Sequence, residues 1–148
     1  MKDEISGEEI QNLDRVWHEL IVSIQKMSEE LWKDRLEGAS TVEISILSII
    51  ERKPDIILKE IIEILGIPGS TLTSAVDRLE KRGLLCRAIS QRDRRSFGLE
   101  LTDDGRIAQQ EHRENEKILW EKVLGSYDTS HERTELIRLL KILAENIN

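Results

Sequence analysis

A chain of 148 residues can form one domain with a substantial hydrophobic core, or a smaller domain with helical extensions. Aromatic residues make up only 3% of it, so isoleucine and leucine must supply most of that core. The net charge of −7 by itself argues against a nucleic-acid partner, so the distribution of the charge along the chain has to decide.

The cysteine content and the N-terminus indicate the cellular compartment. The single cysteine, Cys86, excludes an intrachain disulfide and fits a reducing cytosol. We expect it to be a small buried hydrophobe in preference to a redox sensor. The opening residues MKDEISGEEI lack the apolar stretch of a signal peptide, and no apolar run reaches about 18 residues. The chain is therefore expected to be cytoplasmic, without a membrane-spanning segment.

The N-terminal region predicts one long amphipathic helix from Ile10 to Leu36, ended by Gly38. Its length exceeds what a local core requires. Ser40 and Glu43 then match a capping box, which starts a second helix. The apolar residues of the long helix recur mostly at steps of three and four: Leu13, Trp17, Leu20, Ile21, Ile24, Leu31 and Trp32.

Residues 58–83 predict a helix-turn-helix. A short apolar helix, Leu58–Leu65, is followed by a glycine-containing turn and a second helix from about Gly69 to Arg82, with Gly83 as its C′ residue. The apolar face of this second helix consists of Leu72, Ala75, Val76 and Leu79. Its other side consists of Ser70, Thr73, Ser74 and Lys81, with Thr71 and Arg78 on the flank. Short hydroxyl side chains allow close approach to base edges and phosphates, so this helix is a candidate recognition helix.

A hairpin follows this helix. Leu84–Ile89 and Ser96–Leu101 predict two paired strands, in which Phe97, Leu99 and Leu101 alternate with polar or small residues. Such a hairpin directly after a helix-turn-helix is typical of a wing, which places a basic loop beside the DNA backbone or minor groove.

The loop between the two strands is rich in arginine. Residues 78–101 hold seven basic residues against three acidic ones, a local charge of +4 in a chain of net charge −7. A solvated charge run on a turn is the usual alternative, but the position after the recognition helix favours a DNA contact. We expect Asp93 to form an ion pair with a neighbouring arginine and so to orient it. The arginines of the loop are Arg92, Arg94 and Arg95.

The C-terminal region predicts two further helices. Thr102 should cap the first, whose middle, residues 109–117, contains no apolar residue and is expected to bridge two parts of the molecule with few contacts. Thr129 and Glu132 match a capping box for the last helix, which is apolar around most of its circumference. This surplus of apolar surface points to a partner.

The helix-turn-helix and the hairpin together resemble the MarR family of transcription regulators. The residues that match are Asp77-Arg78-Leu79-Glu80, Gly83-Leu84, Arg87, Asp93-x-Arg95 and Leu101-Thr102-x-x-Gly105. The resemblance implies a homodimer whose first and last helices interlock, and it implies that Arg95 enters the minor groove while Asp93 steadies it. Two departures stand out: Pro68 and Gly69 replace the usual polar pair at the start of the recognition helix, and Ile62 replaces an alanine.

These observations predict a mainly α fold with a small β wing, namely a winged helix-turn-helix flanked by terminal dimerisation helices. We expect residues 1–38 and 118–148 to form the dimerisation region, 39–105 the winged helix-turn-helix, and 106–117 the connecting part of a long helix. The candidate DNA contacts are Ser70, Thr71, Thr73, Ser74, Arg78, Arg92, Arg94 and Arg95. The candidate dimer contacts are Leu13, Trp17, Leu20, Leu136, Leu140 and Leu143.

The expected function is that of a transcriptional repressor that binds double-stranded DNA sequence-specifically. A ligand is expected to release the repressor from its operator. A homodimer would read a pseudo-palindrome with half-sites about 10 base pairs apart. A small aromatic effector near Trp17 and Trp32 would couple to DNA binding, although control by the protein's abundance alone stays open. The alternative function is a winged-helix module that binds protein and not DNA. Neither a nucleophile–base pair nor metal-ligand spacing stands out, so no enzyme, metal or cofactor is expected.

Overall fold

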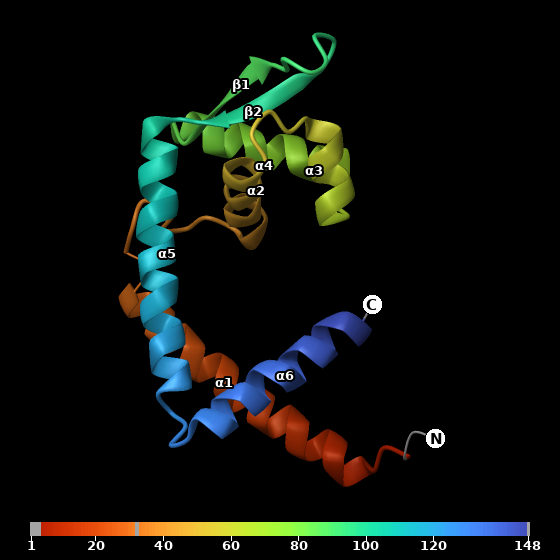
Figure 1. Cartoon of the computed structure of the whole chain (residues 1–148), viewed down its shortest axis with the longest axis vertical. Coiled ribbons are helices and arrows are strands. Elements are labelled where there is room, and N and C mark those ends of the chain that lie inside the picture. The colour runs from red at the N-terminus through yellow and green to blue at the C-terminus, as the bar shows by residue number, and fades with distance from the viewer. Residues whose placement is uncertain (1–3, 32, 148) are drawn as a thin grey trace. The chain divides into compact units, whose positions relative to one another are not determined.

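The computed structural model describes residues 4–31 and 33–147. It contains six helices and one hairpin among these residues (Figure 1). The elements are α1 (Gly7–Leu31), α2 (Thr41–Arg52), α3 (Leu58–Leu65), α4 (Gly69–Lys81), β1 (Leu85–Ile89), β2 (Phe97–Leu101), α5 (Asp103–Leu124) and α6 (Ser130–Asn146). This order confirms the predicted fold class, a mainly α chain with a two-stranded antiparallel wing.

The chain forms two compact units. One unit comprises residues 32–114 and is called here the winged unit; the other comprises residues 1–31 and 115–148 and is called the terminal unit. Among the residues that the structure describes, no helix has both the length and the apolarity needed to cross a bilayer.

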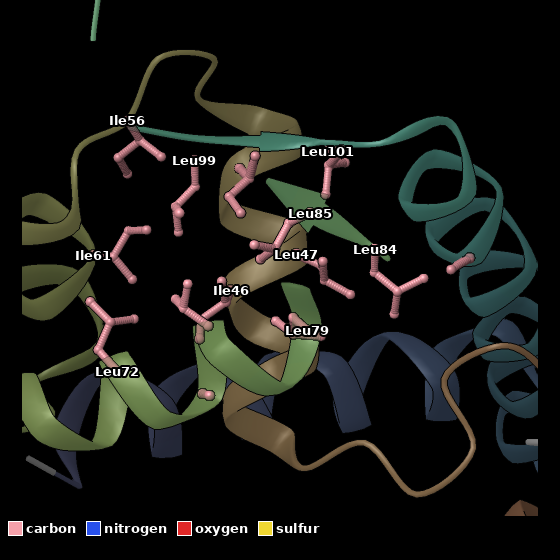
Figure 2. Close-up of a cluster of buried hydrophobic side chains, with 14 of the residues drawn as sticks. Ile46, Leu47, Ile56, Ile61, Leu72, Leu79, Leu84, Leu85, Leu99 and Leu101 are labelled. Carbon is pink, nitrogen blue, oxygen red and sulfur yellow. The ribbon is translucent and has the colours of Figure 1, made fainter. Parts of the chain in front are cut away.

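The hydrophobic core lies in the winged unit, where α2, α3 and α4 pack against one side of the hairpin (Figure 1). Figure 2 shows Leu99 of β2 above Ile46 of α2, with Leu79 of α4 on the opposite side of the cluster. All three side chains are fully buried. Because the strands, α2 and α4 share one core, burial of these leucines and isoleucines fixes the recognition helix and the wing in one body.

Local sequence signals set the ends of the helices. The Ser40–Glu43 and Thr129–Glu132 capping boxes form as predicted. The turn between α3 and α4 begins at Gly66, whose φ of 61° is left-handed. A Cβ at Gly69 would lie at an ordinary contact distance, 3.5 Å, from Cδ1 of Ile62, so the two departures from the family pattern are neighbours in space.

The hairpin pairs β1 and β2 in one register, from Leu85 opposite Leu101 to Ile89 opposite Phe97. The expected alternation holds for Leu99 and Leu101, which are buried, and is wrong for Phe97, which is 57% exposed. Phe97 and its partner Ile89 form the last pair of the ladder before the loop, and Ile89 is exposed as well.

The start of α5 is packed tightly against the segment before β1. The Thr102 hydroxyl accepts a hydrogen bond from the Gly105 N–H at 3.0 Å and donates one to the Gly83 carbonyl at 2.6 Å. A Cβ at Gly105 would overlap the Leu84 carbonyl oxygen. Position 105 therefore requires glycine for close approach, since φ there is not left-handed.

Two predictions about the long helices are wrong. The first helix ends at Leu31 and not at Leu36; Leu36 is buried in the core of the winged unit. The polar middle of α5 is not a segment with few contacts, because Gln109 and His112 are buried. A run of polar side chains favours solvent on all sides of a helix, but a helix that packs on a core can also bury polar residues, as α5 does at Gln109 and His112.

Ion pairs further attach the α5 segment to the winged unit. Arg113 pairs with Glu51 of α2, and Nε of Arg35 lies 3.3 Å from Oε1 of Glu111. The winged unit consequently extends to residue 114, beyond the end expected at residue 105.

A buried carboxylate joins α2 to α4. Glu43 is 4% exposed, and its Oε1 accepts a hydrogen bond from Nε of Arg78 at 3.1 Å. Burial desolvates this carboxylate and by itself raises its pKa, but the hydrogen bonds from Ser40 and the contact with Arg78 outweigh that effect, so the pKa lies below its ordinary value.

Gly105→Ala is predicted to destabilise the protein. Alanine normally stabilises a helix by about 1 kcal/mol over glycine, yet here its methyl group would overlap the Leu84 carbonyl. We expect the free energy of unfolding to fall by about 1–3 kcal/mol, measured by urea denaturation. Gly7→Ala, in α1 with nothing within 4 Å of its Cβ, is the matched control. Equal or greater stability of Gly105→Ala would contradict the close approach.

Glu43→Gln is predicted to remove a pH-dependent contribution to stability. A carboxylate whose pKa is lowered by folding stabilises the native state above its unfolded pKa of about 4.3, and this contribution is lost as the pH falls through the folded pKa. The variant should be about 1–3 kcal/mol less stable than the parent at pH 7, with the gap closing in acid. Urea midpoints at both pH values measure the gap, and exposed Glu63→Gln on α3 is the control. A gap of the same size at every pH would argue against this role for Glu43.

Candidate nucleic-acid interface

Helix α4 presents the two faces that the sequence predicts. Its apolar side is buried, whereas Ser70, Thr71, Thr73 and Ser74 are exposed. The Thr73 hydroxyl donates to the Gly69 carbonyl at 2.9 Å, so its proton is already used within the helix. Ser70, Thr71 and Ser74 are therefore the hydroxyl side chains with the most freedom to contact a ligand.

The beginning of α4 has no side-chain cap. Its N-cap residue is Pro68, whose side chain offers no acceptor to the first-turn N–H groups of the helix. The missing cap follows from the replacement of the usual polar pair by Pro68 and Gly69. Uncapped N–H groups at the positive end of a helix dipole are suited to an anion such as a backbone phosphate.

Several arginines counted in the basic segment are bound within the protein. Arg78 holds Glu43, as described above. Arg87 of β1 pairs with two carboxylates of α4: its Nη2 lies 2.5 Å from Oδ1 of Asp77, and its Nη1 contacts Glu80. Nη2 of Arg82 donates to the carbonyl oxygen of Arg35 at 2.7 Å. These guanidinium groups connect elements of the winged unit, and their charge is partly neutralised there.

Arg92 also makes contacts inside the protein. Its Nη2 lies 2.7 Å from Oε2 of Glu60 on α3 and donates to the Asp55 carbonyl oxygen at 2.9 Å. Sequence reasoning placed Arg92 with the DNA contacts and overlooked Asp55 and Glu60. Both carboxylates lie more than 30 residues away along the chain, so no local pattern could have linked them to the loop.

Asp93 orients the loop, but not by the expected ion pair. Its Oδ1 accepts a hydrogen bond from the Arg95 N–H at 3.0 Å, and its Oδ2 accepts one from the Ser96 hydroxyl at 2.6 Å. The Ser96 hydroxyl and then the Arg95 N–H hold the pKa of Asp93 below its ordinary value. Asp93 thus fixes the backbone that carries Arg95, while the guanidinium stays available.

Arg94 and Arg95 are the exposed cations of the loop. Among the described residues, neither guanidinium takes part in an ion pair. The β1–β2 loop lies at the free end of the hairpin, away from the start of α5 (Figure 1). The wing therefore presents two unneutralised guanidinium groups at its end.

Other candidate residues lie outside this interface. Trp17 is exposed on α1, in the terminal unit, and Trp32 lies outside the described residues. The prediction that Cys86 is buried is wrong: its thiol is exposed on β1, where the strand turns Leu85 inward and its neighbour outward. Over residues 4–31 and 33–147 there is no group of side chains arranged to hold a metal ion.

Comparison with known proteins agrees with this geometry. The sequence model of the MarR family matches residues 38–96. The chain is 25% identical to the HTH-type transcriptional repressor MdtR of Bacillus subtilis (strain 168) over 141 residues, which are 92% of this chain and 90% of MdtR. It is 39% identical over 92 residues to the HTH-type transcriptional regulator PecS of Dickeya dadantii (strain 3937), covering 59% of this chain and 54% of PecS.

Solved structures show the same fold. The crystal structure of Streptococcus pneumoniae FabT in complex with DNA matches with a TM-score of 0.79 at 23% identity, over 93% of this chain and 96% of FabT. The transcriptional regulator BldR from Sulfolobus solfataricus matches with a TM-score of 0.63 at 27% identity, over 95% and 99% of the two chains. Residues 38–96, which include the recognition helix and most of the wing, thus match the MarR family, and the curated relatives of the chain are named as transcriptional regulators.

Proposed function

We propose that this regulator is a homodimeric repressor that binds a pseudo-palindromic operator, with α4 in the major groove and the wing on the adjacent minor groove. The observation that carries the proposal is the pairing of a helix with short exposed hydroxyl side chains and a loop with two unneutralised arginines in one rigid unit. Ser70, Thr71 and Ser74 supply contacts to base edges, and the uncapped start of α4 supplies contacts to phosphate.

The wing contributes through Arg94 and Arg95. A narrow minor groove is strongly electronegative and favours an inserted guanidinium group. Asp93 fixes the N–H of Arg95, so less backbone freedom is lost when this side chain enters the groove. Arg94 lacks such a contact in the described structure and serves as a phosphate ligand at the groove edge.

The terminal helices supply the dimer interface. No residue of α1 or α6 is buried along the described length of either helix. Large apolar side chains on both helices nevertheless face solvent, including Leu13 at 68% and Leu140 at 53% exposed. Trp17, Leu20 and Leu143 are exposed in the same way, and Leu136 is half-buried. A second copy of the chain would cover this surface, since such apolar helices are rarely left in water.

Relief of repression by a small aromatic molecule is part of the proposal. The proposed ligand binds beside the indole of Trp17, within the apolar surface that the second copy is proposed to cover. The ligand acts only through a difference in affinity between the DNA-competent and DNA-incompetent forms of the dimer. A coupling of about 1–3 kcal/mol would weaken DNA binding by roughly 5- to 150-fold. A gel-shift titration with aromatic carboxylates and phenols, followed in parallel by tryptophan fluorescence, tests this step.

The dimer is predicted to depend on the terminal helices. Light scattering at micromolar concentration should give twice the 17.1 kDa mass of one chain. Leu140→Lys on α6 should shift the protein toward the monomer, because a lysine charge would be buried in the interface. Ile64→Lys, at a similarly exposed position on α3, is the matched control and should remain dimeric. A parent protein that is monomeric under these conditions would refute the dimer.

The wing arginines are predicted to contribute unequally to operator binding. Arg95→Ala should weaken binding to the DNA upstream of the protein's own coding region more than Arg94→Ala does. Each variant should also reduce the slope of log K against log salt by about 0.9 for the phosphate charge it no longer neutralises. Gel-shift titrations at several salt concentrations measure both effects. Lys141→Ala on α6 removes the same charge and should leave the slope unchanged; equal slopes for all three variants would favour a winged-helix module that binds protein.

A further inference from the structure

The loop between α2 and α3 contains an unusual backbone conformation at Asp55. Among the described residues, Asp55 is the one non-glycine residue with a positive φ, at 60°. Aspartate tolerates the left-handed region better than most residues, but the conformation still needs support from its surroundings. In the described structure, the Asp55 carboxylate makes its hydrogen bonds at the start of the β1–β2 loop.

The Asp55 carboxylate accepts hydrogen bonds from three consecutive residues of the wing. Its Oδ2 lies 3.2 Å from the hydroxyl oxygen of Ser90 and 3.2 Å from the N–H nitrogen of Arg92. Its Oδ1 lies 3.2 Å from the N–H nitrogen of Gln91. Although desolvation raises the pKa of Asp55, these hydrogen bonds outweigh it and leave the pKa lowered. One side chain from the α2–α3 loop thus fixes the first turn of the wing loop.

The Arg92 side chain also binds Asp55, and it binds Glu60 as well. Its Nε lies 3.4 Å from Oδ2 of Asp55, and its two terminal nitrogens lie 2.7 and 3.4 Å from the carboxylate oxygens of Glu60. The guanidinium therefore joins the wing loop to both the α2–α3 loop and α3. Because two carboxylates neutralise its positive charge, the Arg92 guanidinium attracts a phosphate only weakly.

The strand that leaves the loop is attached to the same segment. Ile57 and Gly98 form a β-bridge, and the Leu99 N–H donates to the Ile56 carbonyl at 3.3 Å. A Cβ at Gly98 would lie 3.3 Å from the Ile56 oxygen and 3.4 Å from Oδ1 of Asp55, tighter than most such contacts. Figure 2 shows Ile56 beside the strand that carries Leu99. Residues 55–57 therefore hold the wing at both ends of its loop.

We propose that Asp55 is a positioning residue for DNA binding, which sets the wing relative to α4, and that Arg92 is an internal strut and not a DNA contact. The inference rests on the proposed function and adds residues on the α2–α3 side that determine where Arg94 and Arg95 are presented. When the contact is broken, the loop loses its fixed start, and the two exposed arginines must be ordered at the moment of binding. The entropy lost when the loop is ordered weakens the complex, although no side chain that contacts DNA has been removed.

The first test uses the free protein. Asp55→Asn keeps the size of the side chain and tolerates a positive φ, but it removes the charge and half of the acceptor capacity. We expect amide hydrogen exchange at Gln91 and Arg92 to accelerate by about tenfold, the loss of one hydrogen bond to a charged group, while the amides in the middle of α4 remain unchanged. Unchanged exchange at Gln91 and Arg92 would overturn the proposal whether or not the protein binds DNA.

The second test measures affinity for the operator. Removing a negative charge near the wing should by electrostatics alone strengthen DNA binding, and Glu100→Gln on the exposed side of β2 is the matched control for that effect. We expect Asp55→Asn to bind several-fold more weakly than Glu100→Gln, at an unchanged salt slope. If Asp55→Asn binds as tightly as Glu100→Gln, Asp55 does not position the wing.

Arg92→Gln separates a strut from a phosphate ligand. If Arg92 only connects parts of the protein, Arg92→Gln should weaken DNA binding about as much as Asp55→Asn does. The double variant Asp55→Asn/Arg92→Gln should then bind little more weakly than either single variant. The salt slope should stay unchanged. A slope lower by about 0.9, as expected of Arg94→Ala, would show a phosphate contact and overturn the strut. Failure of the parent protein to bind any operator would refute the proposed function, while hydrogen exchange would still decide whether Asp55 holds the loop.

Discussion

The structure depends on one shared hydrophobic core, in which α4 and the β1–β2 hairpin are packed against α2. Leu79 on the recognition helix and Leu85 and Leu99 on the strands are all fully buried in it. Because these side chains interdigitate at high density, the helix and the wing cannot shift independently without opening a cavity. The geometry that two DNA contacts need is thus a consequence of apolar packing, and it exists before DNA arrives.

Around this core, several arginines connect parts of the protein. Arg78, Arg87 and Arg92 each join two or more elements through a carboxylate, and such pairs add orientation more than net stability. Of the three arginines in the wing loop, Arg94 and Arg95 have no carboxylate partner in the described structure, and these two are available for the proposed contact with DNA. An acidic chain can therefore present a local positive surface without a large excess of basic residues.

The terminal helices follow a different physical rule. Helix α1 has no buried residue along its described length although its apolar residues lie at helical spacing, and the proposed dimer would cover them. The winged unit, by contrast, buries most of its apolar side chains in its own core. Exposed apolar side chains also occur at the loop end of the hairpin, at Ile89 and Phe97.

The sequence by itself determined the elements and their order. Apolar periodicity, the two capping boxes and the glycines at positions 66 and 83 are local signals, so α2, α3, α4, the hairpin and α6 were predicted closely. Contacts between distant residues were decided only by the tertiary structure: Asp55 and Glu60 on Arg92, Glu43 on Arg78, the burial of Gln109 and His112, and the exposure of Cys86 and Phe97. The physical reason is that burial and charge pairing depend on which surfaces meet in space, and a pattern of neighbours along the chain carries no information about that.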